Sequence, residues 1–410
     1  MNRKQFVLVL ILVLVVGGLG LMLYQRNTAS YGRTSSTIGG KVLGDFPVND
    51  IAQITIKQDT NALNLVKKDD LWRVRERGDY AANFSDISEF LRQAPDLKFV
   101  QREQIGPSVL GRLQLVPPGQ GTNAGTLVEL KDKDGKVVRT LLLGKKHMRK
   151  PSGAASSFGG DEGWPDGRYL KVGDNVGVVA NAFDKLEPKA ESWLNKDFLK
   201  IENIRSVAVV TDKETNWWRV VRTNSTADFA FDQPKPGEEL DKNKVSGLGS
   251  FLSYGSFNDV LPPSTDLKSV ALDKPHAVTV ETFDDFKYQL KIGRKTNEEN
   301  CWVQFTISGS FPKERVAGKD EKPEDKEKLD KEFKEKTKKL EEKLATEKGY
   351  EKWIYVMSKW SLDSVLKDRQ ELFVEKKPEE KKSDEKKEGA AEKKPDEKKD
   401  APPEAEKKSQ

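Results

Sequence analysis

The residue types that carry most enzyme chemistry are scarce in this chain. Its 410 residues include two histidines, His147 and His276, and a single cysteine, Cys301. No Cys/His spacing typical of a zinc site is present, and nothing in the sequence places a nucleophile beside either histidine. His147 is expected to be exposed in a basic loop, and Cys301 to be a small buried residue on a strand. We therefore predict no metal, no cofactor and no histidine-based triad, and hence a protein that is not an enzyme.

Carboxylates are gathered in one glycine-rich stretch, Ser152 to Gly167, which contains Asp161, Glu162 and Asp166. The stretch lacks the Gly-Lys-Ser/Thr of a phosphate-binding loop, and acid–base catalysis would also need a pocket. The plainer interpretation is a long hairpin connection. The alternative is a loop that docks on a partner through Asp161 and Glu162, because loops often carry function.

Tryptophans are the other candidates for a functional surface. The candidates in predicted strands and helices include Trp72, Trp217, Trp218, Trp302, Trp353 and Trp360. Core or cross-strand packing is expected to bury most of them. Trp217 and Trp218 are adjacent, so on a strand their side chains point to opposite faces. One of these two is therefore predicted to be exposed and able to anchor a protein partner.

The elements that position these residues begin with short strands in residues 47–200. Apolar runs with polar breaks, such as Ile51 to Gln58 and Leu71 to Val74, are typical of an antiparallel meander. Asp134-Gly135 is a strong signal for a tight hairpin turn. A second hairpin is predicted to turn at Gly173 to Asn175.

Helices are predicted to cover this sheet. An amphipathic pattern begins near Phe84 and ends at Pro95, with Ser85 or Asp86 as the expected cap. Further helical character at Phe183 to Leu194 closes the unit.

Residues 201–374 repeat the same order of elements. The triplet Trp-Arg-Val occurs at Trp72 and again at Trp218, which suggests equivalent strands. A hairpin strand ending in Leu-Leu-Leu-Gly at Gly144 has a counterpart ending in Leu-Lys-Ile-Gly at Gly293. We therefore predict an α+β fold made by tandem duplication of an antiparallel-sheet unit with covering helices.

Two highly charged tracts interrupt and follow the second unit. The first, at about residues 313–350, is inserted at the turn of a hairpin and is rich in Glu/Lys pairs. A single exposed helix is favoured over a coiled coil, because clean heptads are lacking. The second, residues 375–410, has almost no apolar residues and is predicted to be a disordered tail. A weak electrostatic tether is the alternative role for this tail.

The N-terminal segment reads as a membrane anchor. Phe6 to Tyr24 carries no charge and is long enough to cross a bilayer, so residues 1–25 are predicted to form one transmembrane helix. A cleaved signal peptide is the rival, but its apolar region is normally shorter. Arg3 and Lys4 place the N-terminus in the cytoplasm. Residues 26–46 then form a flexible linker to an extracytoplasmic, periplasmic domain.

The overall charge of the chain excludes few classes of binding partner. The net charge is +5 and 33% of residues are charged, but much of this charge lies in the two tracts with both signs present. Neither tract is a basic patch, so no nucleic-acid partner is predicted.

Several of these motifs together resemble a known family. The anchor, the Trp72 strand, the hairpin ending at Gly144 and the segment Trp193 to Val210 are similar to the bacterial domain-of-unknown-function family numbered 4340, over about Gly44 to Val220. Members resemble accessory proteins encoded beside ABC-2-type exporters related to the gliding-motility transporter, and they have no known catalytic residues. The resemblance implies an ABC transporter subunit as partner. It transfers no site residue.

The resulting hypothesis is a non-enzymatic accessory or scaffold protein, anchored in the bacterial inner membrane, for which the sequence identifies no small-molecule substrate. One alternative is an envelope polysaccharide-binding or hydrolytic module that uses the loop from Asp161 to Asp166. Another is a spacer whose charged tail reaches into the cell wall.

Overall fold

A computed structural model describes residues 40–121, 123–149, 164–211, 216–295, 298–317 and 321–374. The predicted anchor, most of the linker, the loop with Asp161 and Glu162, and the charged tail lie outside the described residues. Among the described residues, no helix is long and apolar enough to cross a membrane. The chain divides into two units, Met1–Phe373 and Val374–Gln410, and the elements below belong to the first.

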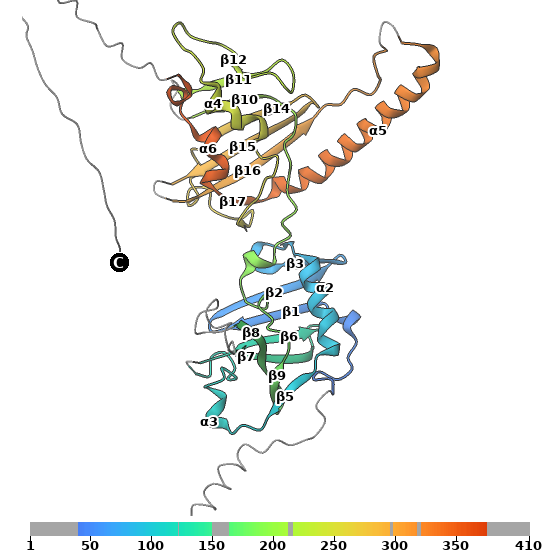
Figure 1. Cartoon of the computed structure of the whole chain (residues 1–410), viewed down its shortest axis with the longest axis vertical. Helices are drawn as coiled ribbons and strands as arrows, with labels where there is room; N and C mark the ends of the chain where they lie inside the picture. The colour runs from blue at the N-terminus through green and yellow to red at the C-terminus, as the bar shows by residue number, and fades with distance from the viewer. Residues whose placement is uncertain are drawn as a thin grey trace, which may run out of the picture. The chain divides into compact units, whose positions relative to one another are not determined.

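The N-terminal half forms a nine-stranded antiparallel sheet in the order β4-β3-β2-β1-β6-β7-β8-β9-β5 (Figure 1). Its strands are β1 (Gln53–Gln58), β2 (Asn61–Lys68), β3 (Leu71–Val74), β4 (Tyr80–Ala81), β5 (Phe99–Glu103), β6 (Thr126–Lys131), β7 (Val137–Arg149), β8 (Trp164–Val172) and β9 (Asn175–Val179). Alternating residues of β6 are buried, as expected for a sheet with one face in the core.

The predicted hairpin turns are confirmed. Asp132 accepts hydrogen bonds at its Oδ1 from the backbone N–H of Asp134 (3.0 Å) and Lys136 (2.9 Å), and Gly135 has φ 79°. Gly173, at the β8–β9 turn, has φ 56°. Glycine reaches this left-handed region without the steric cost of a side chain.

Helix α2 (Phe84–Gln93) covers the first sheet and buries Ile87 and Phe90. Its cap is Asn83, whose side chain accepts from the N–H of Ser85, so the predicted cap at Ser85 or Asp86 is wrong by two or three positions. Asn is one of the best N-cap residues for the same reason as Ser or Asp.

The predicted closing helix at Phe183 to Leu194 is also wrong. The structure contains only the short 3-10 helix η5 (Ala190–Trp193) there. Phe183 adopts φ 50°, which no α-helix contains, and Pro188 removes a backbone donor. A second short helix, α3 (Pro107–Leu110), begins the segment that joins β5 to β6.

The C-terminal half forms an eight-stranded antiparallel sheet in the order β12-β11-β10-β14-β15-β16-β17-β13. Its strands are β10 (Ile204–Val210), β11 (Trp218–Val221), β12 (Ala230–Phe231), β13 (Asp259–Leu261), β14 (His276–Thr282), β15 (Phe286–Arg294), β16 (Asn300–Gly309) and β17 (Ile354–Ser358). Its helices are α4 (Lys242–Val245), η7 (Ser246–Ser250), α5 (Pro323–Glu347), η8 (Lys348–Lys352), α6 (Lys359–Leu366) and η9 (Arg369–Leu372).

The two sheets share the order of six strands. β1-β6-β7-β8-β9-β5 in the first corresponds to β10-β14-β15-β16-β17-β13 in the second. The two Trp-Arg-Val triplets, however, are not equivalent: β11 pairs with β10 directly, whereas β3 is separated from β1 by β2. The expected equivalence of these strands is therefore wrong. A short alternating triplet fits any half-buried strand equally well.

The glycines that end the two matching hairpin strands do correspond. A Cβ built on Gly144 would lie 2.3 Å from the carbonyl oxygen of Leu113, and one on Gly293 would lie 2.1 Å from that of Val270. In both sheets a crossing segment approaches the strand so closely that only glycine fits.

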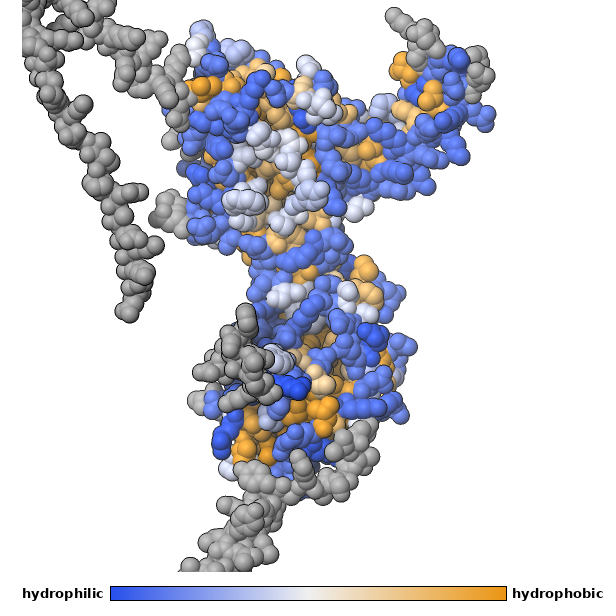
Figure 2. Space-filling model, viewed as in Figure 1, coloured by the Kyte–Doolittle hydropathy of each residue, from blue (hydrophilic) through white to orange (hydrophobic). Residues whose placement is uncertain are grey.

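The inserted tract forms α5, between β16 and β17, as the hairpin-turn insertion predicts. Figure 2 shows that this helix is hydrophilic along most of its length. Pairs such as Lys328–Glu332 and Lys338–Glu342 lie four residues apart on its surface. Leu340 and Leu344, near its C-terminal end, pack against the core.

Candidate interaction sites

Of Trp217 and Trp218, one is buried and one is exposed, as predicted, although β11 begins only at Trp218. Trp218 is fully buried, and its Nε1–H donates to the carbonyl oxygen of Lys367 at 2.9 Å. Trp217 is 39% exposed, and the guanidinium of Arg369 lies 5.7 Å from its ring centroid. Of these two side chains, only Trp217 could reach a partner, and its role as an anchor stays a prediction.

Burial of the other tryptophans is less uniform than expected. Trp72 and Trp193 are buried, but Trp360, at the start of α6, is 87% exposed. The expectation that packing would bury Trp360 is wrong, because it lies in the first turn of the helix while Leu362, Val365 and Leu366 face the core.

A groove of about 270 Å³ lies between α2 and the segment before η5. We call it the α2 groove. Its apolar residues are Phe90, Phe183, Leu186 and Trp193, and its polar residues are Asp86, Glu89, Gln93, Asn181, Asp184 and Lys185. Its lining combines an apolar part with convergent polar groups, which is the usual composition of a binding site.

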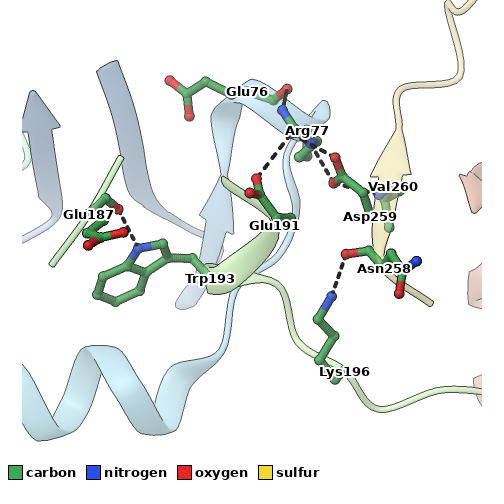
Figure 3. Close-up of polar contacts among 9 residues, drawn as sticks. All are labelled: Glu76, Arg77, Glu187, Glu191, Trp193, Lys196, Asn258, Asp259 and Val260. Carbon is green, nitrogen blue, oxygen red and sulfur yellow. Dashed lines mark hydrogen bonds and ion pairs between the residues drawn. The ribbon is translucent and has the colours of Figure 1, made fainter. Parts of the chain in front are cut away.

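Hydrogen bonds within the lining hold the α2 groove in shape. Asn181 accepts from the N–H of Phe183 (2.8 Å) and donates its Nδ2–H to Gln93 (2.5 Å). The ring of Phe183 meets Phe90 edge-on at 6.1 Å. Trp193 Nε1–H donates to the carbonyl oxygen of Glu187 at 3.1 Å (Figure 3). Backbone and aromatic rings therefore fix the apolar part before any partner binds.

The rim of the α2 groove carries more acid than base. Asp86 pairs with Lys185 across it, and this hydrogen bond raises the pKa of Lys185 above its ordinary value. Glu89, also on the rim, is exposed. The groove is thus suited to an apolar side chain carried by a basic segment.

A second hollow, of about 440 Å³, lies between the α3 segment and strands β7 and β8. We call it the basic cavity. It is lined by Val109, Arg112, Leu113, Lys145, Lys146, His147, Met148 and Tyr169. Sequence reasoning noticed the basic run around His147 but had no signal that would bring Arg112 and Tyr169 to it.

His147 is not a loop residue, contrary to expectation, because β7 extends to Arg149. Its Nδ1 lies 2.6 Å from Oδ1 of Asp166, and its ring meets Tyr169 at 5.8 Å. The hydrogen bond from His147 lowers the pKa of Asp166 below its ordinary value. Asp166 thus orients the imidazole.

Charged side chains also connect the two halves of the chain at a cluster that we call the junction (Figure 3). It consists of Arg77, Glu191, Lys196 and Asp259. The guanidinium of Arg77 donates to both carboxylate oxygens of Asp259, at 2.7 and 2.8 Å, and lies 3.6 Å from Glu191. The bond to Asp259 raises the pKa of Arg77. Lys196 donates to the carbonyl oxygens of Phe257 (3.2 Å) and Asn258 (2.9 Å).

Aromatic rings pack beside this pair. Tyr80 meets Trp353 edge-on at 5.2 Å and Phe257 at 5.9 Å. Burial raises the pKa of Tyr80 to about 12, so its hydroxyl stays neutral at physiological pH. The junction therefore combines a two-pronged ion pair with a buried ring cluster.

We expect a double-mutant cycle of Arg77→Ala and Asp259→Ala to give a coupling energy of about 1.5–3 kcal/mol, the range for hydrogen bonds to charged groups. Both side chains are about one quarter exposed, 23% and 24%, so solvent screens the pair only partly. Urea unfolding of the wild type, the two single variants and the double variant measures this coupling energy. The exposed pair Lys242–Asp228 is the control and should show no measurable coupling. Equal coupling energies in both cycles would show that the Arg77–Asp259 pair is no stronger than an exposed surface pair.

A family model described as Domain of unknown function (DUF4340) matches residues 72–275. All lining residues of the α2 groove and the basic cavity, and the charged residues of the junction, fall in this range. No curated protein and no solved structure matches the chain.

Proposed function

Because the chain belongs to the DUF4340 family, we propose that it is a non-enzymatic accessory protein of a bacterial ABC-type transport or envelope complex. An N-terminal helix anchors it in the inner membrane, and its sheets stand on the periplasmic side. We further propose that the two sheets are a tandem duplication, residues 47–200 and 201–374. The shared order of six strands and the matching positions of Gly144 and Gly293 support this origin.

The α2 groove is the observation that carries the docking proposal. It offers apolar surface from Phe90 and Trp193 beside an acidic rim, and its lining is held by internal hydrogen bonds. A preformed site of this kind does not need to order side chains on binding, which saves conformational entropy. A protein segment with an apolar side chain next to Lys or Arg fits this chemistry.

The position of η5 supports a role for the junction in the same function. Trp193 of η5 lines the α2 groove, and Glu191 of the same turn faces Arg77. A partner seated in the groove therefore contacts the element that helps to tie the two sheets together. Docking is expected to make the junction more stable.

Site-specific photocrosslinking in native membranes tests the proposal. A photoreactive amino acid at Glu89, which is exposed on the groove rim, should give a cross-link to one membrane-complex protein, identified by mass spectrometry. The same amino acid at Gln289, an exposed position of β15, is the control and should not give that product.

The proposal fails if Glu89 and Gln289 give the same products, or if neither captures a protein. Recovery of envelope glycan without protein would instead favour the alternative, a polysaccharide-binding or hydrolytic module.

A further inference from the structure

We propose that the basic cavity is a binding site for a phosphate ester, separate from the α2 groove and independent of the docking proposal. The ligand class is a phosphoryl group attached to a small polar moiety, as in a soluble sugar or glycerol phosphate or in a phospholipid headgroup.

The charge of the lining is the first argument. Arg112, Lys145 and Lys146 are all exposed in one hollow, and none of its described lining residues is Asp or Glu. Lys146 pairs with Asp184 at one side. Among the described residues, no carboxylate lies within ion-pair distance of Arg112 or Lys145. Two cations in a concave surface that no described carboxylate neutralises attract an anion more strongly than scattered surface lysines do.

The kinds of donor favour phosphate. Arginine presents a planar fork of N–H groups that matches two phosphoryl oxygens, and lysine adds a point charge. His147 brings a third kind of donor, because Asp166 holds its Nδ1 and thereby fixes the ring.

The size and apolar lining indicate more than a bare ion. A cavity of about 440 Å³ is within the range of small-molecule sites, roughly 300–1,000 Å³, and exceeds the space that one phosphate occupies. Met148 and Tyr169 line it beside the cations. Such surfaces pack against the carbon skeleton of a sugar or glycerol group.

The backbone builds the site in advance. Arg112 and Lys145 come from different segments, which meet where the N–H of Lys145 donates to the carbonyl oxygen of Leu113 at 2.8 Å. This approach depends on Gly144, since a Cβ there would lie 2.3 Å from that same oxygen. The cations are therefore held near one another by hydrogen-bonded backbone, which a chance cluster of surface lysines lacks.

Calorimetric titration of the full-length protein in a neutral detergent with glycerol 1-phosphate tests the proposal, as does titration with a short-chain phosphatidylglycerol in the same detergent. Binding to either probe is expected and should weaken as salt rises. Arg112→Gln and Lys145→Glu should each lower the affinity at least about tenfold, the effect of losing one charge-assisted contact. Arg294→Gln and Lys291→Glu, exposed on β15, are matched controls and should change it less than about twofold.

The two probes distinguish the sources of the phosphate: binding of the soluble ester identifies a small metabolite, and binding of the short-chain lipid alone identifies a headgroup. Amine labelling of the unmodified protein gives a second readout that does not depend on variants, because the bound probe should protect Lys145 and not Lys291. The proposal is overturned if neither probe binds, if cavity and control variants lose affinity equally, or if Lys145 is not protected.

Discussion

Replacing Arg369 with methionine is expected to lower the free energy of unfolding by about 3–5 kcal/mol, the cost of removing one partner of a buried ion pair. Arg369 is 3% exposed and donates to both carboxylate oxygens of Glu238, at 3.0 and 2.6 Å. It also donates to the carbonyl oxygens of Trp217 (3.3 Å) and Gln233 (3.1 Å). Without the guanidinium, a partly buried carboxylate and two carbonyl groups lose their donor.

The same bond makes this effect depend on pH. Hydrogen bonding to Arg369 lowers the pKa of Glu238 below its ordinary value of 4.5. The pair therefore contributes stability above that value, and the contribution is lost as the pH falls through the lowered pKa of the folded state. The difference between wild type and Arg369→Met should shrink on acidification.

Urea unfolding at pH 7 and at acidic pH measures both effects. Lys268→Met, an exposed position on a loop, is the control and should change stability by less than about 0.5 kcal/mol. A loss below about 1 kcal/mol for Arg369→Met would show that the ion pair does not hold η9 in place.

Trp193→Ala is expected to cost about 3–5 kcal/mol and to abolish cross-linking from Glu89. Trp193 is 1% exposed, so its loss leaves a cavity next to Leu186 and removes the apolar part of the α2 groove. The donor to the carbonyl oxygen of Glu187 is lost as well. Calorimetric unfolding and the photocrosslinking yield measure the two effects.

Trp193→Phe separates packing from recognition. Phenylalanine keeps most of the buried area, so it should cost less than alanine does and should retain part of the cross-link. An unchanged cross-link yield in folded Trp193→Ala protein would remove the α2 groove from the docking proposal.

Local features of the fold were predictable because their causes are local. The turn at Asp132 to Gly135 depends on one Asx hydrogen-bonding pattern and one glycine, and the insertion of α5 at a hairpin tip follows from composition. Strand order depends on long-range pairing, so the repeated Trp-Arg-Val suggested a wrong equivalence. The repeated glycines at Gly144 and Gly293 were the better signal, because a close backbone approach restricts the residue type.

The candidate sites were mostly beyond sequence reasoning. Trp217 and the basic run at His147 were visible as residue types, but the residues that complete each site come from distant segments. Arg77 and Asp259 are 182 positions apart. No pattern along the sequence indicates which of the many charged residues will form an ion pair at such a distance. Asp86 and Lys185 are also distant in the sequence, so their ion pair could be found only in the folded chain.

The lone thiol gives the molecule a practical property. Cys301 is fully buried on β16, and burial raises the pKa of its thiol, so it stays protonated and slow to react. A cysteine introduced at Glu89, Lys145 or Gln289 would therefore be the only accessible thiol in the chain. Fluorescent or spin probes could then be attached at one chosen position of the unmodified background, so that docking at the groove and ligand binding in the cavity could be followed separately in the same protein.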